Sequence, residues 1–133
     1  MPTRLAVVRA VAAALGTART EPEVADAVLN NVAEHLGAVT ATIWLVEGNS
    51  LVLVHSRNAD PMVLERLPRV ALEDDVPGTL VIRTGEARFF SSRAELDVRW
   101  PHLADIPSPS NALVVLPLSN GGAITGVVSF GFQ

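Results

Sequence analysis

The chain has 133 residues, enough for one domain with a single hydrophobic core. Apolar residues make up 49% of it and charged residues 18%, which is too apolar for a disordered segment and too interrupted by charge for a membrane span. The ten basic residues are all arginine, and 14 acidic residues bring the net charge to −4 without any basic cluster, so neither nucleic acid nor a membrane is an expected partner.

The first predicted element is an amphipathic helix over residues 5–15. Arg9 stands in the middle of its apolar run, whereas the apolar part of a secretory signal is uninterrupted, so we expect a cytoplasmic protein. The apolar face of this helix is broader than one sheet contact requires. We therefore expect it to contact a second copy of the chain in a homodimer, through Leu5, Val8, Val11 and Leu15.

A second helix is predicted over residues 21–36. Thr20 and Glu23 have the spacing of a capping box, and Pro22 lies in the first turn, where a missing N–H costs nothing. Gly37 is suited to the left-handed conformation that ends a helix. His35, in the last turn, is expected to interact with the C-terminal carbonyl groups.

The period of the apolar residues then changes from 3.6 to 2, which predicts a β-hairpin over 41–47 and 50–57 around Gly48-Asn49. With a two-residue loop, Trp44 faces Leu53 and Thr42 faces His55. Both faces of this hairpin are largely apolar, so a cover is expected on each side of the sheet.

Short elements are predicted in the middle of the chain, where prolines are frequent. Pro61 can begin a helix over 62–67, Pro77 a helix that ends before Gly85, and Ser91 or Ser92 can cap a helix that ends at Trp100. Brief strands are expected at 69–72 and 87–90. The acidic run 73–75 lacks the spacing of a calcium loop, so Asp74 or Asp75 is expected to cap the helix at Pro77.

A second hairpin is predicted over 111–118 and 123–132, with Asn120-Gly121 as its turn. This register places Val114 opposite Val127, and it groups Leu113, Val115 and Pro117 with Ile124, Gly126 and Val128 on one face. The order of elements indicates an α+β fold in which an antiparallel sheet lies between helices.

Three parts of the sequence resemble a bacterial GAF domain: residues 72–90 (LEDDVPGTLVIRTGEARFF), Arg99-Trp100-Pro101, and Leu116-Pro117-Leu118 followed by 126–130 (GVVSF). The resemblance covers nearly the whole chain. GAF domains usually end with a C-terminal helix, and this sequence stops after its last strand, so we expect a truncated domain.

This resemblance implies a single domain with four parts: N-terminal helices on one face of the sheet (1–37), a first hairpin (38–57), a variable segment that covers a pocket on the other face (58–110) and a last hairpin (111–133). It implies a sensory or regulatory module fused to an output domain, as in a histidine kinase or a PP2C-like phosphatase. The pocket-facing candidates are Trp44, Leu53, His55, Phe90, Trp100 and His102. Trp44 and Leu53 also fit a plain core, whereas His55 on a covered face needs a partner or a pocket.

Several chemistries known for GAF-like proteins need residues that this chain lacks. Covalent bilin attachment and free-methionine sulfoxide reduction both use cysteine, and there is none. The cyclic-nucleotide motif includes a lysine, so that ligand is disfavoured. Haem stays open because His35, His55 and His102 are each possible axial ligands, and no other cofactor or metal site is identified.

Catalysis by the chain alone is not expected. The sequences G-x-x-x-x-G-K-[ST], G-x-G-x-x-G and H-E-x-x-H are absent, and residues 126–131 miss a nucleophile elbow by one residue, which makes Ser129 a strand residue. Two hypotheses remain: a module that senses a small molecule, or a ligandless dimerisation and relay module.

Overall fold

The computed structural model describes Thr3, Leu5, Arg9 and residues 31–133. Apart from Leu5 and Arg9, which are helical, the predicted helix over 5–15 lies outside the described residues, as does most of the helix over 21–36. The end of the second helix is confirmed: α3 (Ala33–Leu36) stops at Gly37, which has a φ of 74° and donates its N–H to the Ala33 and Glu34 carbonyl groups. His35 is exposed in the last turn.

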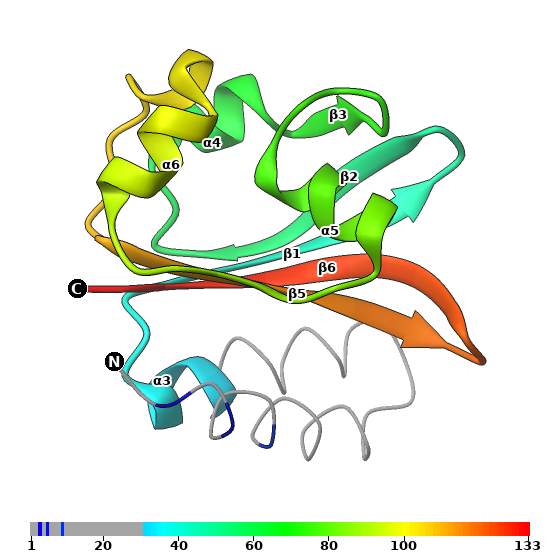
Figure 1. Cartoon of the computed structure of the whole chain (residues 1–133), viewed down its shortest axis with the longest axis horizontal. Coiled ribbons are helices and arrows are strands. Elements are labelled where there is room, and N and C mark those ends of the chain that lie inside the picture. Colours follow the sequence, from blue (N-terminus) through cyan, green and yellow to red (C-terminus); the bar gives the residue numbers. More distant parts are fainter. Residues whose placement is uncertain (1–2, 4, 6–8, 10–30) are drawn as a thin grey trace.

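A six-stranded antiparallel sheet forms the centre of the molecule (Figure 1). Its strands lie in the order β3-β2-β1-β6-β5-β4, so the two long hairpins meet at the centre through β1 and β6. The strand bounds are β1 (Thr40–Glu47), β2 (Ser50–Arg57), β3 (Arg69–Ala71), β4 (Arg88–Phe90), β5 (Ala112–Asn120) and β6 (Ala123–Phe132).

Helices lie on both faces of this sheet, which confirms the predicted α+β class. On one face lies α3, and on the other lie the short helices of the middle segment (Figure 1). The prolines act as predicted. Pro61 and Pro77 are the first residues of α4 and α5, and α6 ends at Arg99, just before Trp100-Pro101. The bounds on that face are α4 (Pro61–Arg66), α5 (Pro77–Thr84), α6 (Arg93–Arg99) and the 3₁₀ helix η2 (Pro101–Leu103).

The face that α3 covers, which we call the closed face, holds the larger apolar cluster. Ile43, Val114, Val128 and Phe130 contribute from the inner strands, and each is at most 2% exposed. Ala33 of α3 and Val32, the residue before it, pack onto these side chains. The opposite face, which we call the cavity face, has a smaller buried cluster of Leu51, Val70, Val81, Val115 and Val127.

The first hairpin follows its predicted register only as far as a β-bulge. Trp44 pairs with Leu53 as predicted, but one extra residue of β2 follows, and Thr42 pairs with Ser56 instead of His55. His55 pairs with Ile43, whose side chain is buried on the closed face, and is itself exposed. The prediction that Thr42 faces His55 is therefore wrong, because a bulge shifts every residue beyond it.

The register predicted for the last hairpin is wrong throughout. The turn is Gly121-Gly122, one residue later than predicted, because both residues have positive φ and a type I′ turn requires this at both central positions. A further irregularity follows at Leu118-Ser119. Val114 consequently pairs with Phe130, and Val115 pairs with Ser129 on the cavity face, where the prediction had placed Val128.

Candidate ligand-binding cavity

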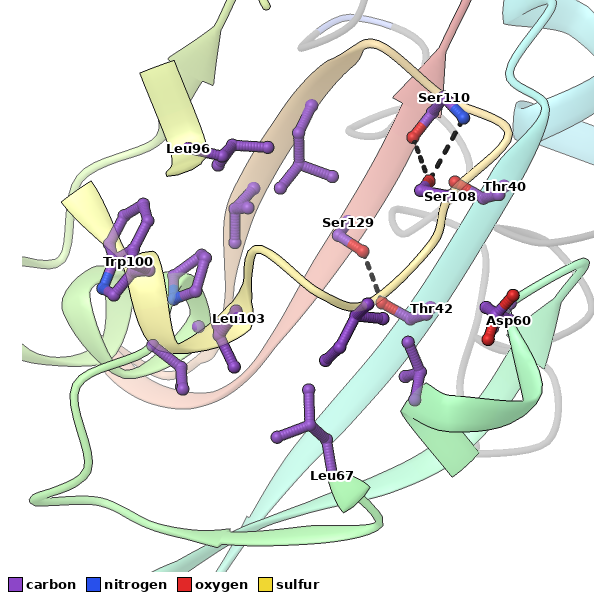
Figure 2. Close-up of a pocket in the computed structure, with 18 of the residues that line it drawn as sticks. Thr40, Thr42, Asp60, Leu67, Leu96, Trp100, Leu103, Ser108, Ser110 and Ser129 are labelled. Atoms are coloured by element: carbon purple, nitrogen blue, oxygen red, sulfur yellow. Dashed lines mark hydrogen bonds between the residues drawn. The ribbon is translucent and has the colours of Figure 1, made fainter. Parts of the chain in front are cut away.

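A cavity of about 220 Å³ lies between the cavity face of the sheet and the middle segment (Figure 2). Strands β1, β5 and β6 form its floor. We call the cover the lid, which consists of α4, α6, η2 and the loop that continues to Ser110. The lining is mainly apolar, and its residues are Thr40, Thr42, Trp44, Leu51, Ala59, Asp60, Val63, Leu67, Val70, Val76, Pro77, Gly78, Arg93, Leu96, Asp97, Trp100, Leu103, Ile106, Pro107, Ser108, Ser110, Leu113, Val115, Val127 and Ser129.

Three side chains form a polar group on the floor, which we call the floor triad: Thr42, Trp44 and Ser129. Thr42 and Ser129 are cross-strand partners on β1 and β6, and their hydroxyl groups form a short hydrogen bond (Figure 2). The indole Nε1 of Trp44 donates to Thr42 Oγ1 at 2.9 Å, from two residues further along the same face of β1. The sheet ladder fixes all three positions, so this polar group is rigid.

A second hydroxyl pair lies where the loop reaches the end of the sheet. Ser108 and Ser110, which we call the rim serines, have their hydroxyl oxygens 2.7 Å apart, and Ser110 N–H donates to Ser108 Oγ at 3.1 Å. They lie beside Thr40 (Figure 2). A Cβ at Gly131 would collide with both Thr40 Oγ1 and Ser110 Oγ, so only glycine permits this close approach.

Arg93 holds the lid in shape from the N-terminus of α6. Its Nε donates to Asp97 Oδ1 at 2.8 Å, and its Nη2 donates to the carbonyl groups of Ala104 and Ile106 at 3.1 and 2.6 Å. The loop carbonyl groups gain a charged donor, and the guanidinium gains a carboxylate partner. Ser92 is the N-cap of α6: its backbone is extended, and its hydroxyl oxygen accepts from Glu95 N–H.

Arg66 joins the two halves of the lid. From the end of α4, its Nη1 lies 2.8 Å from Asp105 Oδ2, and its Nη2 donates to the His102 carbonyl group at 3.3 Å. The hydrogen bond from Arg66 lowers the pKa of the Asp105 carboxyl, with the Arg66 charge acting in the same direction and desolvation opposing it.

Trp100 closes the lid toward α5. It is 1% exposed, its ring meets Phe90 edge to face at 5.4 Å, and its Nε1 donates to Asp75 Oδ1 at 3.0 Å. His102 Nε2 donates to the Asp75 carbonyl group at 2.8 Å. Asp75 therefore fastens the lid, and the prediction that it or Asp74 caps α5 is wrong.

Val76 is the N-cap residue of α5, and the polar contacts there come from Thr79 in the first turn. Its hydroxyl oxygen accepts from Val76 N–H at 3.3 Å and its hydroxyl hydrogen is given to the Asp74 carbonyl group. The carboxylate of Asp74 accepts from Ala71 N–H in the preceding turn.

A model of one protein family matches residues 18–133, which is most of the chain, and that family is described as the GAF domain. The chain belongs to the GAF domain family. No curated protein sequence matches it.

Solved structures share the GAF fold at low sequence identity. The GAF domain of a phosphoenolpyruvate-protein phosphotransferase from Coxiella burnetii has a TM-score of 0.70 at 15% identity, over 96% of this chain and 76% of that one. Free methionine-R-sulfoxide reductase from Neisseria meningitidis, solved with its substrate, has a TM-score of 0.70 at 17% identity, over 99% and 77%. A Staphylococcus aureus NreA protein mutated in its nitrate binding site has a TM-score of 0.65 at 16% identity, over 86% and 87%.

Two of the six candidate site residues of this GAF domain line the cavity: Trp44 and Trp100. Leu53 and Phe90 are half-buried beside it and do not line it. His55 and His102 are exposed, His55 on the closed face and His102 on the outside of the lid. A ligand role for any of the six remains a prediction.

Two residues of the cavity, Ser129 and Arg93, were not predicted as site residues; Ser129 was expected only to be a strand residue. The signal for Ser129 was its alternation with Val127 on β6, but the wrong register placed it on the other face. For Arg93 the signal was weaker, since an arginine at the start of a helix is unfavourable beside the helix dipole and suggests a partner elsewhere.

In the part of the chain that the structure describes, no group of three or more metal-ligating side chains comes together. His35, His55 and His102 all lie outside the cavity lining, so haem ligation by them stays a prediction. Among the described helices, none has the length and apolar character to cross a bilayer.

Proposed function

We propose that this GAF domain is a cytoplasmic sensory module that binds a small molecule in the cavity and regulates an output domain fused to it. The observation that carries the proposal is the cavity of about 220 Å³ over a floor, fixed by the sheet ladder, that combines apolar side chains with hydroxyl groups. Ligand sites are typically concave and apolar with a few convergent polar groups. A tightly packed relay module has no need of such a space.

The lid supplies a way for binding to affect the rest of the protein. Arg66 joins its segments through an exposed ion pair, which contributes little free energy. Arg93 and Asp75 add a few part-buried hydrogen bonds, so only a small number of polar contacts hold the lid. A ligand that touches both floor and lid favours the closed arrangement over others in which the lid has moved. Its binding free energy then biases the segments attached to the domain.

We infer a regulatory role without catalysis by this chain alone. The Neisseria meningitidis neighbour is an enzyme, but the chemistry attributed to such GAF-like enzymes uses cysteine, which this sequence lacks. Among the described residues, the cavity lining contains no histidine, and its one arginine is engaged with Asp97 and loop carbonyl groups. These groups can position a ligand and offer no evident nucleophile and base in contact.

The test is a thermal-shift screen of small metabolites, followed by calorimetry on each hit. Val115→Phe is the matched variant, because Val115 is a floor residue whose enlarged side chain would occupy the cavity. Hits are expected to raise the Tm of the parent protein and to leave that of the folded variant unchanged. A screen without any hit, or hits that the variant binds equally well, would contradict the proposal.

Dimerisation with relay is a second candidate, compatible with the first. Leu5 is 57% exposed, so its side chain is available to a second copy. Val8, Val11 and Leu15 lie outside the described residues. A Leu5→Glu, Leu15→Glu variant is expected to lower the molar mass found by light scattering, and an unchanged mass would exclude this surface.

A further inference from the structure

The floor triad contains one more hydrogen-bond donor than it uses. Trp44 Nε1 can only donate, and it gives its hydrogen to Thr42 Oγ1. Thr42 and Ser129 then share one hydrogen bond but have two hydroxyl hydrogens. Whichever of the two donates, one hydroxyl hydrogen is left, and no further partner for it exists among the described residues.

The remaining hydrogen constrains what can fill the cavity. Both oxygens are half-buried on the cavity floor, so a ligand that covers them removes water from them (Figure 2). A donor that loses water and gains no acceptor costs more than an unfilled lone pair, which buried oxygens commonly tolerate. A ligand that binds well must therefore bring an acceptor to Thr42 and Ser129.

The charges of the lining favour a neutral ligand. Its ionisable side chains are Arg93, Asp60 and Asp97, and the charge of Arg93 is balanced by Asp97 at 2.8 Å. Asp60 has no ion-pair partner among the described residues; its carboxylate accepts from Met62 N–H at 2.9 Å as the cap of α4, where the N-terminal end of the helix offsets part of its charge. An anion would meet no uncompensated positive charge here, and burying an unpaired ion in an apolar site is costly.

We infer that the ligand is a small, neutral, mainly hydrocarbon molecule with one oxygen acceptor, such as a carbonyl or ether oxygen, which takes the free hydrogen of the floor triad. This inference rests on the proposed function and assigns its ligand class. The size agrees: a cavity of about 150 Å³ holds benzene, so about 220 Å³ accommodates a six-membered ring with a polar substituent.

The experiment uses one ring with four substituents: cyclohexanone, methylenecyclohexane, cyclohexanecarboxylate and cyclohexylammonium. Ligand-observed NMR gives a Kd for each on the unmodified protein. We expect the ketone to bind at least about tenfold more tightly than either ion. The ketone and the alkene differ mainly in the acceptor, so the ratio of their two Kd values measures its effect.

Variants of the triad then test the count of hydrogens. Ser129→Ala leaves Thr42 with its own hydrogen free, so the ketone-to-alkene ratio is expected to stay within about twofold of the parent. Replacing all three residues (Trp44→Phe, Thr42→Val, Ser129→Ala) removes every donor. The affinity of the ketone relative to the alkene is then expected to fall by about two- to tenfold. Ser119→Ala, at an exposed serine of β5 outside the cavity lining, is the control and should change nothing.

The outcomes separate this inference from the proposed function. If an ion binds more tightly than the ketone, if Ser129→Ala abolishes the preference, or if the triple variant keeps it, the ligand class is wrong while the cavity remains a binding site. If none of the four probes binds while the metabolite screen finds ligands that Val115→Phe loses, only the ligand class is wrong; if neither experiment finds binding, both proposals fail. Binding of the alkene by the triple variant shows that its cavity is intact. If the triple variant does not fold, the order of the Kd values for the ketone and the two ions, together with the Ser129→Ala result, decides whether the ligand class is right.

Discussion

The two faces of the sheet use the same strands for different purposes. On the closed face, side chains such as Val114, Val128 and Phe130 have no measurable exposure and pack against one another and α3. On the cavity face, their strand neighbours Val115, Val127 and Ser129 line a space of about 220 Å³. Strand alternation alone separates these two environments by one residue along β5 and β6.

This difference shows where stability and recognition reside in the domain. The closed face buries apolar area continuously and should dominate the free energy of unfolding. The cavity face gives up some of that packing, keeps hydroxyl groups at Thr42 and Ser129, and is covered by a lid that polar contacts join. Substitutions of adjacent residues on one strand can test this division directly.

The largest effect is expected for Phe130→Ala. Phe130 is 0% exposed on the closed face, so the substitution removes a large buried side chain and leaves a cavity. We expect a loss of about 3–5 kcal/mol in the free energy of unfolding, measured with urea. Its neighbour Ser129→Ala, on the cavity face, is the control and should lose less than about 1 kcal/mol. Equal losses would contradict the division between the faces.

A smaller effect is expected when a methylene group is added on each face. Val128→Ile enlarges a side chain in the closed cluster and should cost about 1–3 kcal/mol, because well-packed cores resist overpacking. Val127→Ile enlarges a buried side chain that borders the cavity, where the added methylene group has space, so it should cost less than Val128→Ile. Thermal unfolding of the two variants gives both values, and a larger loss for Val127→Ile would reverse the interpretation.

The same two strands show how far the sequence could predict the structure. Apolar alternation, Pro61, Pro77 and Gly37 were enough to place the strands and helix ends, because these signals act within a few residues. The face to which each residue of β6 points depends on the turn, and Asn120-Gly121 and Gly121-Gly122 are both favourable turn pairs. The positive φ of Gly122 decides between them, and local preference did not reveal it.

The candidate site was predicted less well for a related reason. Trp44 and Trp100 were identified because large aromatic residues near a covered sheet are conspicuous, and both line the cavity. The partner of Thr42 was expected to be His55 and is Ser129 from the other hairpin. That contact joins residues 87 positions apart. The bulge that moves His55 away from Thr42 lies opposite Ile43 and Trp44, and it has no sequence signature.

An effect smaller than that of Phe130→Ala and larger than that of the lid's surface ion pair is expected at Asp75, which accepts from the buried indole of Trp100 at 3.0 Å. Asp75→Ala leaves that N–H buried without an acceptor and should cost about 1–2 kcal/mol in thermal unfolding. Asp75→Asn keeps an oxygen in place and is the matched control, with a smaller loss. If the two variants are equally stable, the hydrogen bond does not hold the lid to α5.

The smallest effect is expected at the ion pair between Arg66 and Asp105, on the surface of the lid. Because Arg66 lowers the pKa of Asp105 in the folded protein, the ion pair stabilises the fold above the pKa of a free aspartate, about 3.9, and the stabilisation is lost as the pH falls through the lower folded value. An NMR titration should show this pKa rising in Arg66→Gln. The stability difference between the parent and Asp105→Asn should shrink from pH 7 to pH 3. Since both side chains are exposed to solvent, this stability difference should stay far below the loss for Phe130→Ala. If Arg66→Gln leaves the pKa of Asp105 unchanged, Arg66 does not join the halves of the lid in solution.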